Sequence, residues 1–254
     1  FITVDMGGTS FDASVVQRGV PLLRSEGWIA RQRLALPMLD IHTIGAGGGS
    51  IGWIDDGGLL RMGPQSAGAQ PGPACYGRGG ELPTCTDANL VLGYLEPDYF
   101  LGGRMKLDRE AARRAIETHI AKPLGISVEQ AAAGMFHVVN VNMAAGLREI
   151  TVSRGIDPRE YPLVVAGGAG PIHGAMIALE LELPVIVVPR ESSIFCASGM
   201  LRSDFKHSYV RTYHALGSEA DTRVMAKHFA ELERQGRQVL HDERVTAHDR
   251  VRVE

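Results

Sequence analysis

The opening stretch of the chain, residues 1–24, places the strongest constraint on its fold, and it reads FITVDMGGTSFDASVVQRGVPLLR. Two β-forming runs, residues 1–4 and 13–17, flank the glycine-bearing turn at residues 7–9. Apolar runs joined by a turn of this kind are typical of a β-hairpin. We therefore expect two antiparallel strands with the glycines at their shared tip.

The tip of this hairpin carries groups that suit phosphate. Gly7 and Gly8 let backbone N–H groups approach phosphate oxygens because no Cβ stands in the way. Thr9 can donate a hydrogen bond, and the carboxylate of Asp5 can hold Mg²⁺ directly or through its waters. An ordinary tight hairpin with a solvated Asp5 is the alternative. Asp12, just after the tip, is either a second functional acid or a residue of the hairpin surface.

Composition excludes several classes of protein. A chain of 254 residues with 44% hydrophobic and 22% charged residues is typical of a globular protein with a real core. A net charge of -3 without a basic stripe argues against nucleic acid or an anionic membrane as a partner. The apolar stretch near residues 183–189 is far too short to span a membrane. The three cysteines fit no CxxC spacing, which favours reduced thiols in a cytoplasmic protein.

Both ends of the chain fall in strand-like sequence. The chain begins at Phe1 without a Met, and residues 250–254 resemble another strand. We therefore expect a segment of a longer polypeptide, with part of any active site outside this segment.

Glycine is concentrated in one region, since 13 of the 31 glycines lie within residues 45–80. This region begins with a glycine loop, residues 45–50, and continues into a predicted hairpin, residues 51–62. The prolines that follow exclude a central strand or a helix interior. The alternatives are an unstructured linker and an ordered loop that covers something, and the presence of Cys75 and Tyr76 favours the ordered loop.

The second half of the chain alternates helices and strands. Periodicity and caps (Asp108; Ser127 with Gln130) predict helices at residues 86–92, 109–120, 128–153 and 219–241. A strand at residues 162–166, a glycine turn, a helix at 172–181 and a strand at 184–188 form a βαβ unit. Hairpins followed by such a unit imply a mixed sheet with helices on its faces.

The glycine loops do not match the common nucleotide fingerprints. Residues 45–50 are followed by a hairpin rather than a helix, residues 167–174 miss the third glycine of GxGxxG by one position, and no Walker A sequence occurs. The turn of Gly167, Gly168 and Gly170 still precedes a helix, whose free N–H groups can receive an anion or a ribose–adenine edge. A close-packed βα turn is the alternative.

The two glycine turns together resemble the second phosphate element and the adenosine element of the ATPase fold of actin, sugar kinases and heat-shock chaperones. A closer resemblance, to the hydantoinase A/oxoprolinase family, covers most of residues 1–210. Its blocks are VDMGGTSFDASVV (4–16), DIHTIGAGGGSI (40–51), RMGPQSAGAQPGPACYGRGG (61–80), TDANLVLGYLEPDYFLGG (86–103) and VVAGGAGPIHGA (164–175).

This family includes ATP-dependent N-methylhydantoinase, 5-oxoprolinase and the nucleotide-binding subunits of acetone and acetophenone carboxylases. The resemblance implies an actin-like (ribonuclease-H-like) α/β fold, ATP with Mg²⁺, a second enzyme subunit, a homo-oligomer, and a further phosphate loop upstream. It also implies an ATPase domain over residues 1–210, with a Gly/Pro-rich insertion at 30–105 and a helical and βαβ part at 106–210. Residues 211–254 would then begin a C-terminal region.

The resemblance also implies roles for the candidate residues. Asp5 and Asp12 would be catalytic acids, with Asp5 orienting Mg²⁺ or the attacking oxygen. The phosphates would rest against Gly7, Gly8 and Thr9. The adenosine would lie against Gly167, Gly168 and Gly170.

A second divalent metal is a further hypothesis, based on Asp40, His42, Asp87 and His173. Asp40 and His42 would share one face of a strand at residues 39–44, while Asp87 and His173 each begin a helix. Carboxylates and imidazoles of this kind suit a metal ion. The alternatives are hydrogen-bonded structural histidines and an N-capping aspartate. For Cys75 the choice is between a nucleophile and a buried thiol, and the thiol is favoured because no base is identifiable nearby.

The predicted function is ATP-dependent hydrolysis of a cyclic amide of the hydantoin or 5-oxoproline type, through phosphorylation of a carbonyl oxygen. The alternatives are a ketone carboxylase subunit of the same family, a small-molecule kinase, and a nucleotide-gated scaffold without enzymatic activity.

Overall fold

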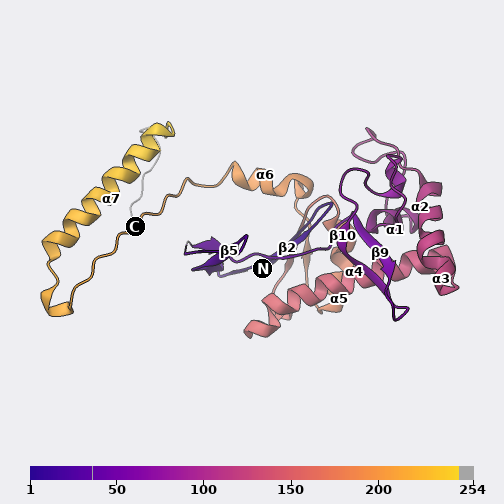
Figure 1. Cartoon of the computed structure of the whole chain (residues 1–254), viewed down its shortest axis with the longest axis horizontal. Coiled ribbons are helices and arrows are strands. Elements are labelled where there is room, and N and C mark those ends of the chain that lie inside the picture. Colours follow the sequence, from indigo (N-terminus) through magenta and orange to yellow (C-terminus); the bar gives the residue numbers. More distant parts are fainter. Residues whose placement is uncertain (36, 246–254) are drawn as a thin grey trace. The chain divides into compact units, whose positions relative to one another are not determined.

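The computed structural model describes residues 1–35 and 37–245, and its chain forms two compact units, Phe1–Met200 and Leu201–Glu254 (Figure 1). The strand predicted at residues 250–254 lies outside the described residues.

A mixed β-sheet forms the centre of the first unit. The predicted hairpin is confirmed as β1 (Ile2–Met6) and β2 (Phe11–Gln17), which pair antiparallel with Ile2 opposite Val15. On one side of this hairpin the sheet continues through β11 (Leu163–Ala166) and β12 (Ile186–Val187), which are both parallel to β1. On the other side, β3 (Val20–Pro21) and β8 (His42–Ile44) both pair antiparallel with β2. In β1, buried Ile2, Val4 and Met6 alternate with half-buried Thr3 and Asp5, so one face of the sheet is directed into the core.

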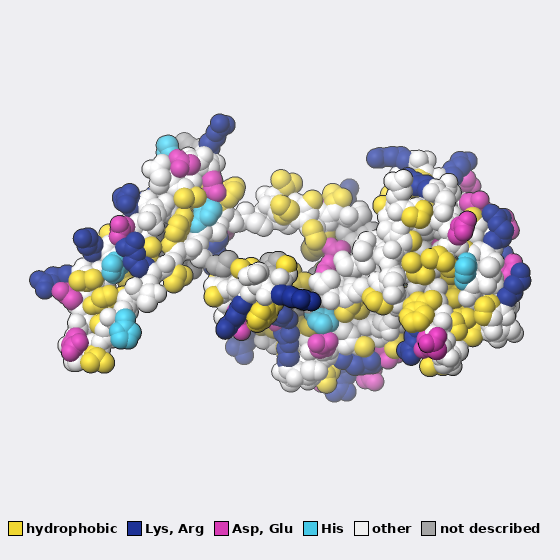
Figure 2. Space-filling model, in the orientation of Figure 1, with side chains coloured by type: hydrophobic (Ala, Val, Ile, Leu, Met, Phe, Trp, Pro, Cys, Tyr) yellow, Lys and Arg dark blue, Asp and Glu magenta, His cyan; other side chains and the backbone are white. Residues whose placement is uncertain are grey.

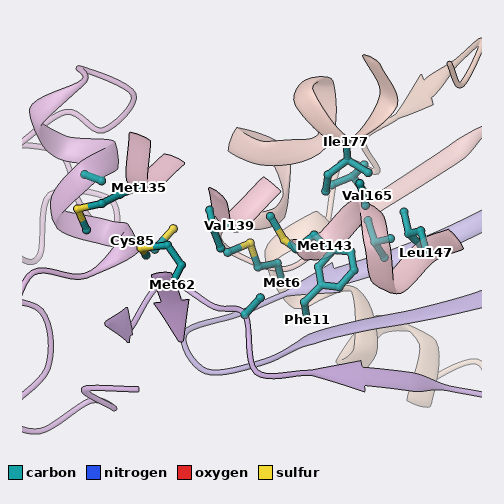
Figure 3. Packing of buried hydrophobic residues seen from close by; sticks show 14 of the residues in the cluster. Met6, Phe11, Met62, Cys85, Met135, Val139, Met143, Leu147, Val165 and Ile177 are labelled. Carbon is teal, nitrogen blue, oxygen red and sulfur yellow. The ribbon is translucent and has the colours of Figure 1, made fainter. Parts of the chain in front are cut away.

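Two helices pack on this apolar face. The long helix α4 (Val128–Ile150) begins at the predicted capping box, in which Ser127 and Gln130 bond each other's backbone N–H groups. Helix α5 (Gly170–Glu180) links β11 to β12, as the predicted βαβ unit requires. Figure 3 shows Val139, Met143 and Leu147 of α4 directed toward Met6 and Phe11, and Ile177 of α5 near Val165. The chain is thus a mixed α/β fold with flanking helices.

The Gly/Pro-rich region is an ordered structure built against the start of α4. It contains the predicted hairpin, as β9 (Ser50–Ile54) and β10 (Leu60–Ser66), and the helix α1 (Cys85–Val91). The helices α2 (Arg109–Ile116) and α3 (Lys122–Leu124) follow this region, as Figure 1 shows. The central acceptor of the Gly/Pro-rich region is Asp87, whose exposed fraction is 0%. The carboxylate of Asp87 accepts hydrogen bonds from the N–H groups of Ala74 (3.2 Å), Cys75 (2.8 Å) and Thr84 (2.9 Å), and from the Thr84 hydroxyl (2.7 Å). One buried acid therefore holds the proline-rich loop on α1.

Several predicted boundaries were wrong for local reasons. The helix predicted at 128–153 ends at Ile150, because the hydroxyl of Thr151 donates to the Leu147 carbonyl at 2.6 Å and the chain turns. The helix predicted at 109–120 ends at Ile116 and continues as a π-helical turn, Glu117–Ala121. The strand predicted at 39–44 is interrupted after β7 (Met38–Leu39), because Asp40 turns inward to two arginines.

Three further short strands complete the list of strands in this unit. In the segment before Asp40, β4 (Leu23–Arg24) pairs with β7, and β5 (Gly27–Ile29) pairs with β6 (Gln32–Leu34).

In the described residues of the second unit, an extended segment and a 3-10 turn (Gly217–Glu219) precede helix α7 (Thr222–Asp242). Helix α7 begins after Asp221 because that carboxylate accepts from the N–H of Arg223 at 2.8 Å. Arg211 forms an ion pair with Glu231 of α7, and Tyr213 contacts the ring of His228. Among the described helices, none has the length and apolar content needed to cross a lipid bilayer. On the face drawn in Figure 2, basic and acidic side chains are interspersed.

Replacing Asp87 with alanine should destabilise the protein by about 3 kcal/mol, because several buried donors would lose their shared acceptor. The matched control is Asp108→Ala, which removes an exposed helix cap that accepts from the Ala111 N–H at 2.8 Å and should cost about 1 kcal/mol. Urea unfolding measures both. Equal losses for the two variants would contradict the role of Asp87.

Candidate functional site

The hairpin tip and the Gly167 turn meet at one edge of the sheet. β1 and β11 run parallel with Asp5 opposite Ala166, so the residues that follow each strand emerge together. The N–H of Ala169 donates to the Met6 carbonyl at 3.0 Å and joins the two turns directly. Two glycine turns that are far apart in the sequence therefore lie next to each other.

Gly167 shows how close this approach is. Its φ is +86°, and a Cβ there would stand 2.2 Å from the Met6 carbonyl oxygen and 2.6 Å from Asp5 Oδ1. Only glycine satisfies both the backbone conformation and the contact. The role of Gly167 is thus to bring the turn against Asp5.

A third glycine loop, residues 45–49, supports the tip from behind. The N–H groups of Gly48 and Gly49 donate to the carbonyls of Gly7 (3.0 Å) and Gly8 (2.7 Å). A Cβ on Gly47 would stand 2.5 Å from the backbone nitrogen of Thr9. In the sequence this loop fits no nucleotide fingerprint, and it is marked by its density of glycines and by the family block at residues 40–51.

On the other side, the tip and the turn face open space. A Cβ on Gly7, Gly8 or Gly168 would meet no atom within 4 Å. The N–H groups of Gly8 and Gly168 take part in none of the hydrogen bonds found among residues 1–35 and 37–245. Helix α5 also begins behind this turn without a side-chain cap. Unpaired N–H groups at a helix start and an open backbone surface are what a phosphate group needs.

Two carboxylates stand beside these N–H groups. Asp5 and Asp12 are directly opposite in the β1–β2 register, and Asp12 accepts from the hydroxyls of Ser10 (3.2 Å) and Thr43 (2.5 Å). The thiol of Cys196, in α6 (Phe195–Met200), donates to Asp5 Oδ2 at 3.0 Å. That hydrogen bond, together with burial and the charges of both acids, raises the pKa of Cys196, so the thiol remains a donor. No pattern in the sequence linked Cys196 to Asp5.

Asp40 and His42 each have a charged partner elsewhere in the chain. Asp40 is 7% exposed and pairs with both Arg24 and Arg154. Burial alone would raise the pKa of Asp40, but the hydrogen bonds and charges of the arginines outweigh it and hold that pKa below its usual value. His42 Nε2 lies 3.4 Å from Glu149 Oε2 instead. The two arginines already neutralise the acid that a metal would need.

Asp87 and His173 also have structural partners. Asp87 closes a capping box with Thr84, and so acts three residues after the cap and not as the predicted N-cap. His173 is fully buried, with Asn140 Oδ1 3.2 Å from its Nδ1. Burial also raises the pKa of Cys75, which fits the buried thiol and not the nucleophile. The described part of the chain contains no group of three or more His, Cys, Asp or Glu that could hold a metal ion.

A hollow of about 440 Å³ lies elsewhere, among residues that include Arg148, Asp157 and Glu180. Glu180 ends α5, whereas the glycine turn begins it. This hollow is therefore separate from the glycine loops, and its basic residues are paired with acids, Arg148 with Glu180 and Arg159 with Asp157.

Comparison with known proteins identifies the class. The model of the Hydantoinase/oxoprolinase family matches residues 1–209, so the chain belongs to this family. The family resemblance seen in the sequence is confirmed.

Particular relatives define this membership more closely. The alpha subunit of a caprolactamase from Pseudomonas jessenii is 48% identical over 211 residues, which cover 83% of this chain and 30% of that subunit. The crystal structure of the ATP-dependent caprolactamase of that organism has a TM-score of 0.74 at 42% identity, covering 95% of this chain and 35% of that one. A nucleotide-free structure of acetone carboxylase, from a study of ATP-dependent acetone carboxylation, has a TM-score of 0.75 at 37% identity, covering 80% and 29%. The chain thus spans about a third of the length of these three relatives.

The ion pairs of Asp40 give a stability that depends on pH. Because the folded pKa of Asp40 lies below the unfolded value, this contribution is present above the unfolded pKa and is lost as pH falls through the folded pKa. Asp40→Asn should cost about 1 kcal/mol at pH 7, a modest value because the arginines are partly exposed, and almost nothing at the acid limit. Urea unfolding at a series of pH values checks this, and a loss that is constant with pH would contradict it.

The backing loop gives a second prediction. Gly47→Ala should destabilise the protein by about 2 to 3 kcal/mol, because its Cβ would collide with the backbone of Gly8 and Thr9. Gly7→Ala, whose Cβ meets open space, should change stability by less than about 0.5 kcal/mol. Thermal unfolding compares the pair, and equal effects would show that loop 45–49 does not hold the tip.

Proposed function

We propose that this chain forms one wall of the nucleotide site in an ATP-dependent enzyme that opens a cyclic amide. The observation that carries the proposal is the meeting of the unpaired N–H groups of Gly8 and Gly168 beside the carboxylate of Asp5. This arrangement offers hydrogen-bond donors and a metal-binding acid in one place, which phosphoryl transfer mainly requires.

The fold supports an actin-like, ribonuclease-H-like domain. Its sheet joins an antiparallel hairpin to two parallel strands reached through helices, and its glycine turns lie at the edge where such a domain would meet a nucleotide. In this proposal residues 1–210 form the ATPase domain, which includes the Gly/Pro-rich insertion at 30–105. The further phosphate loop expected upstream would complete the cleft.

The residues present fit Mg²⁺ with a nucleotide phosphate. Asp5 and Asp12 are direct cross-strand neighbours, and like charges in such positions repel each other unless a cation lies between them. Gly7, Gly8 and Thr9 would then cradle the phosphates, while Gly167, Gly168 and Gly170 would lie along the adenosine. Asp5 would orient the metal or the attacking oxygen, with Asp12 held in place by the hydroxyls of Ser10 and Thr43.

ATP would supply the phosphoryl group that turns the amide carbonyl oxygen into a leaving group. The higher identity to the caprolactamase subunit, 48% against 37% for the acetone carboxylase structure, favours a cyclic amide over a ketone. A ketone carboxylase subunit is the second candidate, because the fold matches that carboxylase equally well. As with the relative named as a subunit alpha, we expect a second subunit, in a cytoplasmic homo-oligomer.

Product analysis separates the candidates. The full-length polypeptide, with any subunit encoded beside it, is incubated with ATP and caprolactam, hydantoins, 5-oxoproline, or ketones with bicarbonate. Free phosphate with an opened ring supports the proposal. A carboxylated ketone supports the second candidate, a stable phosphoester indicates a kinase, and nucleotide turnover that no substrate stimulates indicates a scaffold.

Asp5→Asn tests the site itself. The amide keeps the shape of the side chain and can accept from the Cys196 thiol, but it lacks the charge that holds Mg²⁺. Substrate-dependent ADP formation should fall about 100-fold or more. Asp98→Asn, at an exposed ion pair with Lys106, is the matched control and should retain full activity. Unchanged ADP formation in Asp5→Asn would remove the hairpin tip from the site.

A further inference from the structure

His173 is a buried side chain that joins three helices. It lies in the first turn of α5, directly after the glycine turn, and its exposed fraction is 0%. Its ring contacts Asn140 of α4 on one side, and Asn89 and Cys85 of α1 on the other. The ring of Phe136 is stacked on it with centroids 5.0 Å apart.

The hydrogen bonds define the tautomer of His173. Asn140 Nδ2 donates to the Phe136 carbonyl at 2.7 Å, so Asn140 Oδ1 faces His173 and must accept from Nδ1–H at 3.2 Å. Burial lowers the pKa of His173 to about 4, which keeps the ring neutral. Nε2 is therefore an acceptor, and it receives the amide of Asn89 at 3.2 Å and the thiol of Cys85 at 3.5 Å.

In this geometry one polar atom of Asn89 has no hydrogen bond to any described residue. Its Oδ1 is buried and has no hydrogen-bond partner among the described residues. A buried acceptor without a donor is unfavourable, and an apolar side chain would avoid it. The Nδ2 group of the same amide is directed at His173, 3.2 Å from its Nε2.

The first turn of α1, which contains Cys85, also reaches the hairpin tip. Both the N–H and the hydroxyl of Thr86 donate to the Gly48 carbonyl at 2.8 Å, and the Gly48 N–H donates to the Gly7 carbonyl at 3.0 Å. Hydrogen bonds through Gly48 thus connect the hairpin tip to α1. The contacts of His173 with Asn89 and Cys85 then connect α1 to α5. This path of contacts closes on the Gly167 turn from which α5 begins.

The sheet provides only part of this link, through the hydrogen bond from the Ala169 N–H to the Met6 carbonyl at 3.0 Å. Gly170 and Gly174 place α5 directly on Val165, where added Cβ atoms would stand 3.1 Å and 3.0 Å from its side chain. That contact fixes the height of α5 above the sheet. Sliding of α5 relative to α1, parallel to the sheet, is restrained by the polar contacts of His173.

We propose that His173 is a positioning residue: by linking α5 to α1 and α4 it restrains the Gly168 turn relative to the Gly8 tip, in addition to the direct Ala169–Met6 hydrogen bond. This restraint would raise the affinity for the nucleotide that both turns contact. This inference rests on the proposed function. His173 touches neither the phosphates nor a metal, and it acts through the helices that carry the two turns.

Two substitutions of different reach test it in the full-length protein. The amide of His173→Gln extends about as far as Nε2 and can still reach Asn89, whereas the shorter His173→Asn can bond only Asn140. Calorimetric titration with ATP and Mg²⁺ should show a Kd raised about tenfold for His173→Asn and much less for His173→Gln. Asn89→Ala should match His173→Asn, and the double variant should be no worse than either single one.

Phe136→Leu is the matched control, because it removes the stacked ring but leaves the hydrogen bonds of His173. It should lower the melting temperature and leave the ATP Kd within about twofold of wild type. Should His173→Asn and Asn89→Ala bind ATP as wild type does, the inference is wrong while the proposed function stands. Should the wild-type protein fail to bind ATP, the proposed function fails first. Should one histidine variant not fold, Asn89→Ala and the other still decide the question.

Discussion

The parallel pairing of β1 with β11 is the interaction on which the candidate site depends. It places Asp5 opposite Ala166, so a hairpin tip and a βα turn emerge at the same edge of the sheet. Each turn provides only part of the candidate site. The hairpin provides carboxylates, and the βα turn provides a helix start with unpaired N–H groups. The apolar face of the strands, buried under α4 and α5, holds the two together without using any polar group of the site.

Glycine has two opposite uses around this edge. At Gly47 and Gly167 the missing side chain lets backbone meet backbone, with a Cβ excluded by contacts of 2.5 Å and 2.2 Å. At Gly8 and Gly168 it leaves the surface open. The first kind fixes the loops against one another, and the second kind leaves N–H groups available to a ligand. A rigid frame with an exposed backbone is a favourable arrangement for an anion, because little entropy is lost on binding.

Local patterns in the sequence predicted most of the fold but less of the site. The hairpin, the capping box of α4 and the βαβ unit follow from short-range signals, and each is present. The residues of the metal hypothesis illustrate the reason, since spacing cannot show what a side chain meets: Asp40 meets Arg154, which is 114 residues away. For the same reason the contacts of Cys196 with Asp5 and of His173 with Asn89 had no local signal. Fold class is encoded in periodicity, whereas a site is encoded in long-range contacts.

The buried polar residues separate into two groups by how well their hydrogen bonds are satisfied. Asp87 uses its acceptor oxygens fully, and Asp40 is matched by two arginines, so these residues lower the energy of one fixed loop conformation. The His173 cluster is different, since it leaves Asn89 Oδ1 without a partner and still links three helices. An apolar side chain in place of Asn89 would bury no such atom but would also lose the hydrogen bond to His173. The unpaired atom is understandable if the cluster helps to position the Gly168 turn relative to the Gly8 tip. Directional hydrogen bonds define such a position more sharply than apolar packing does.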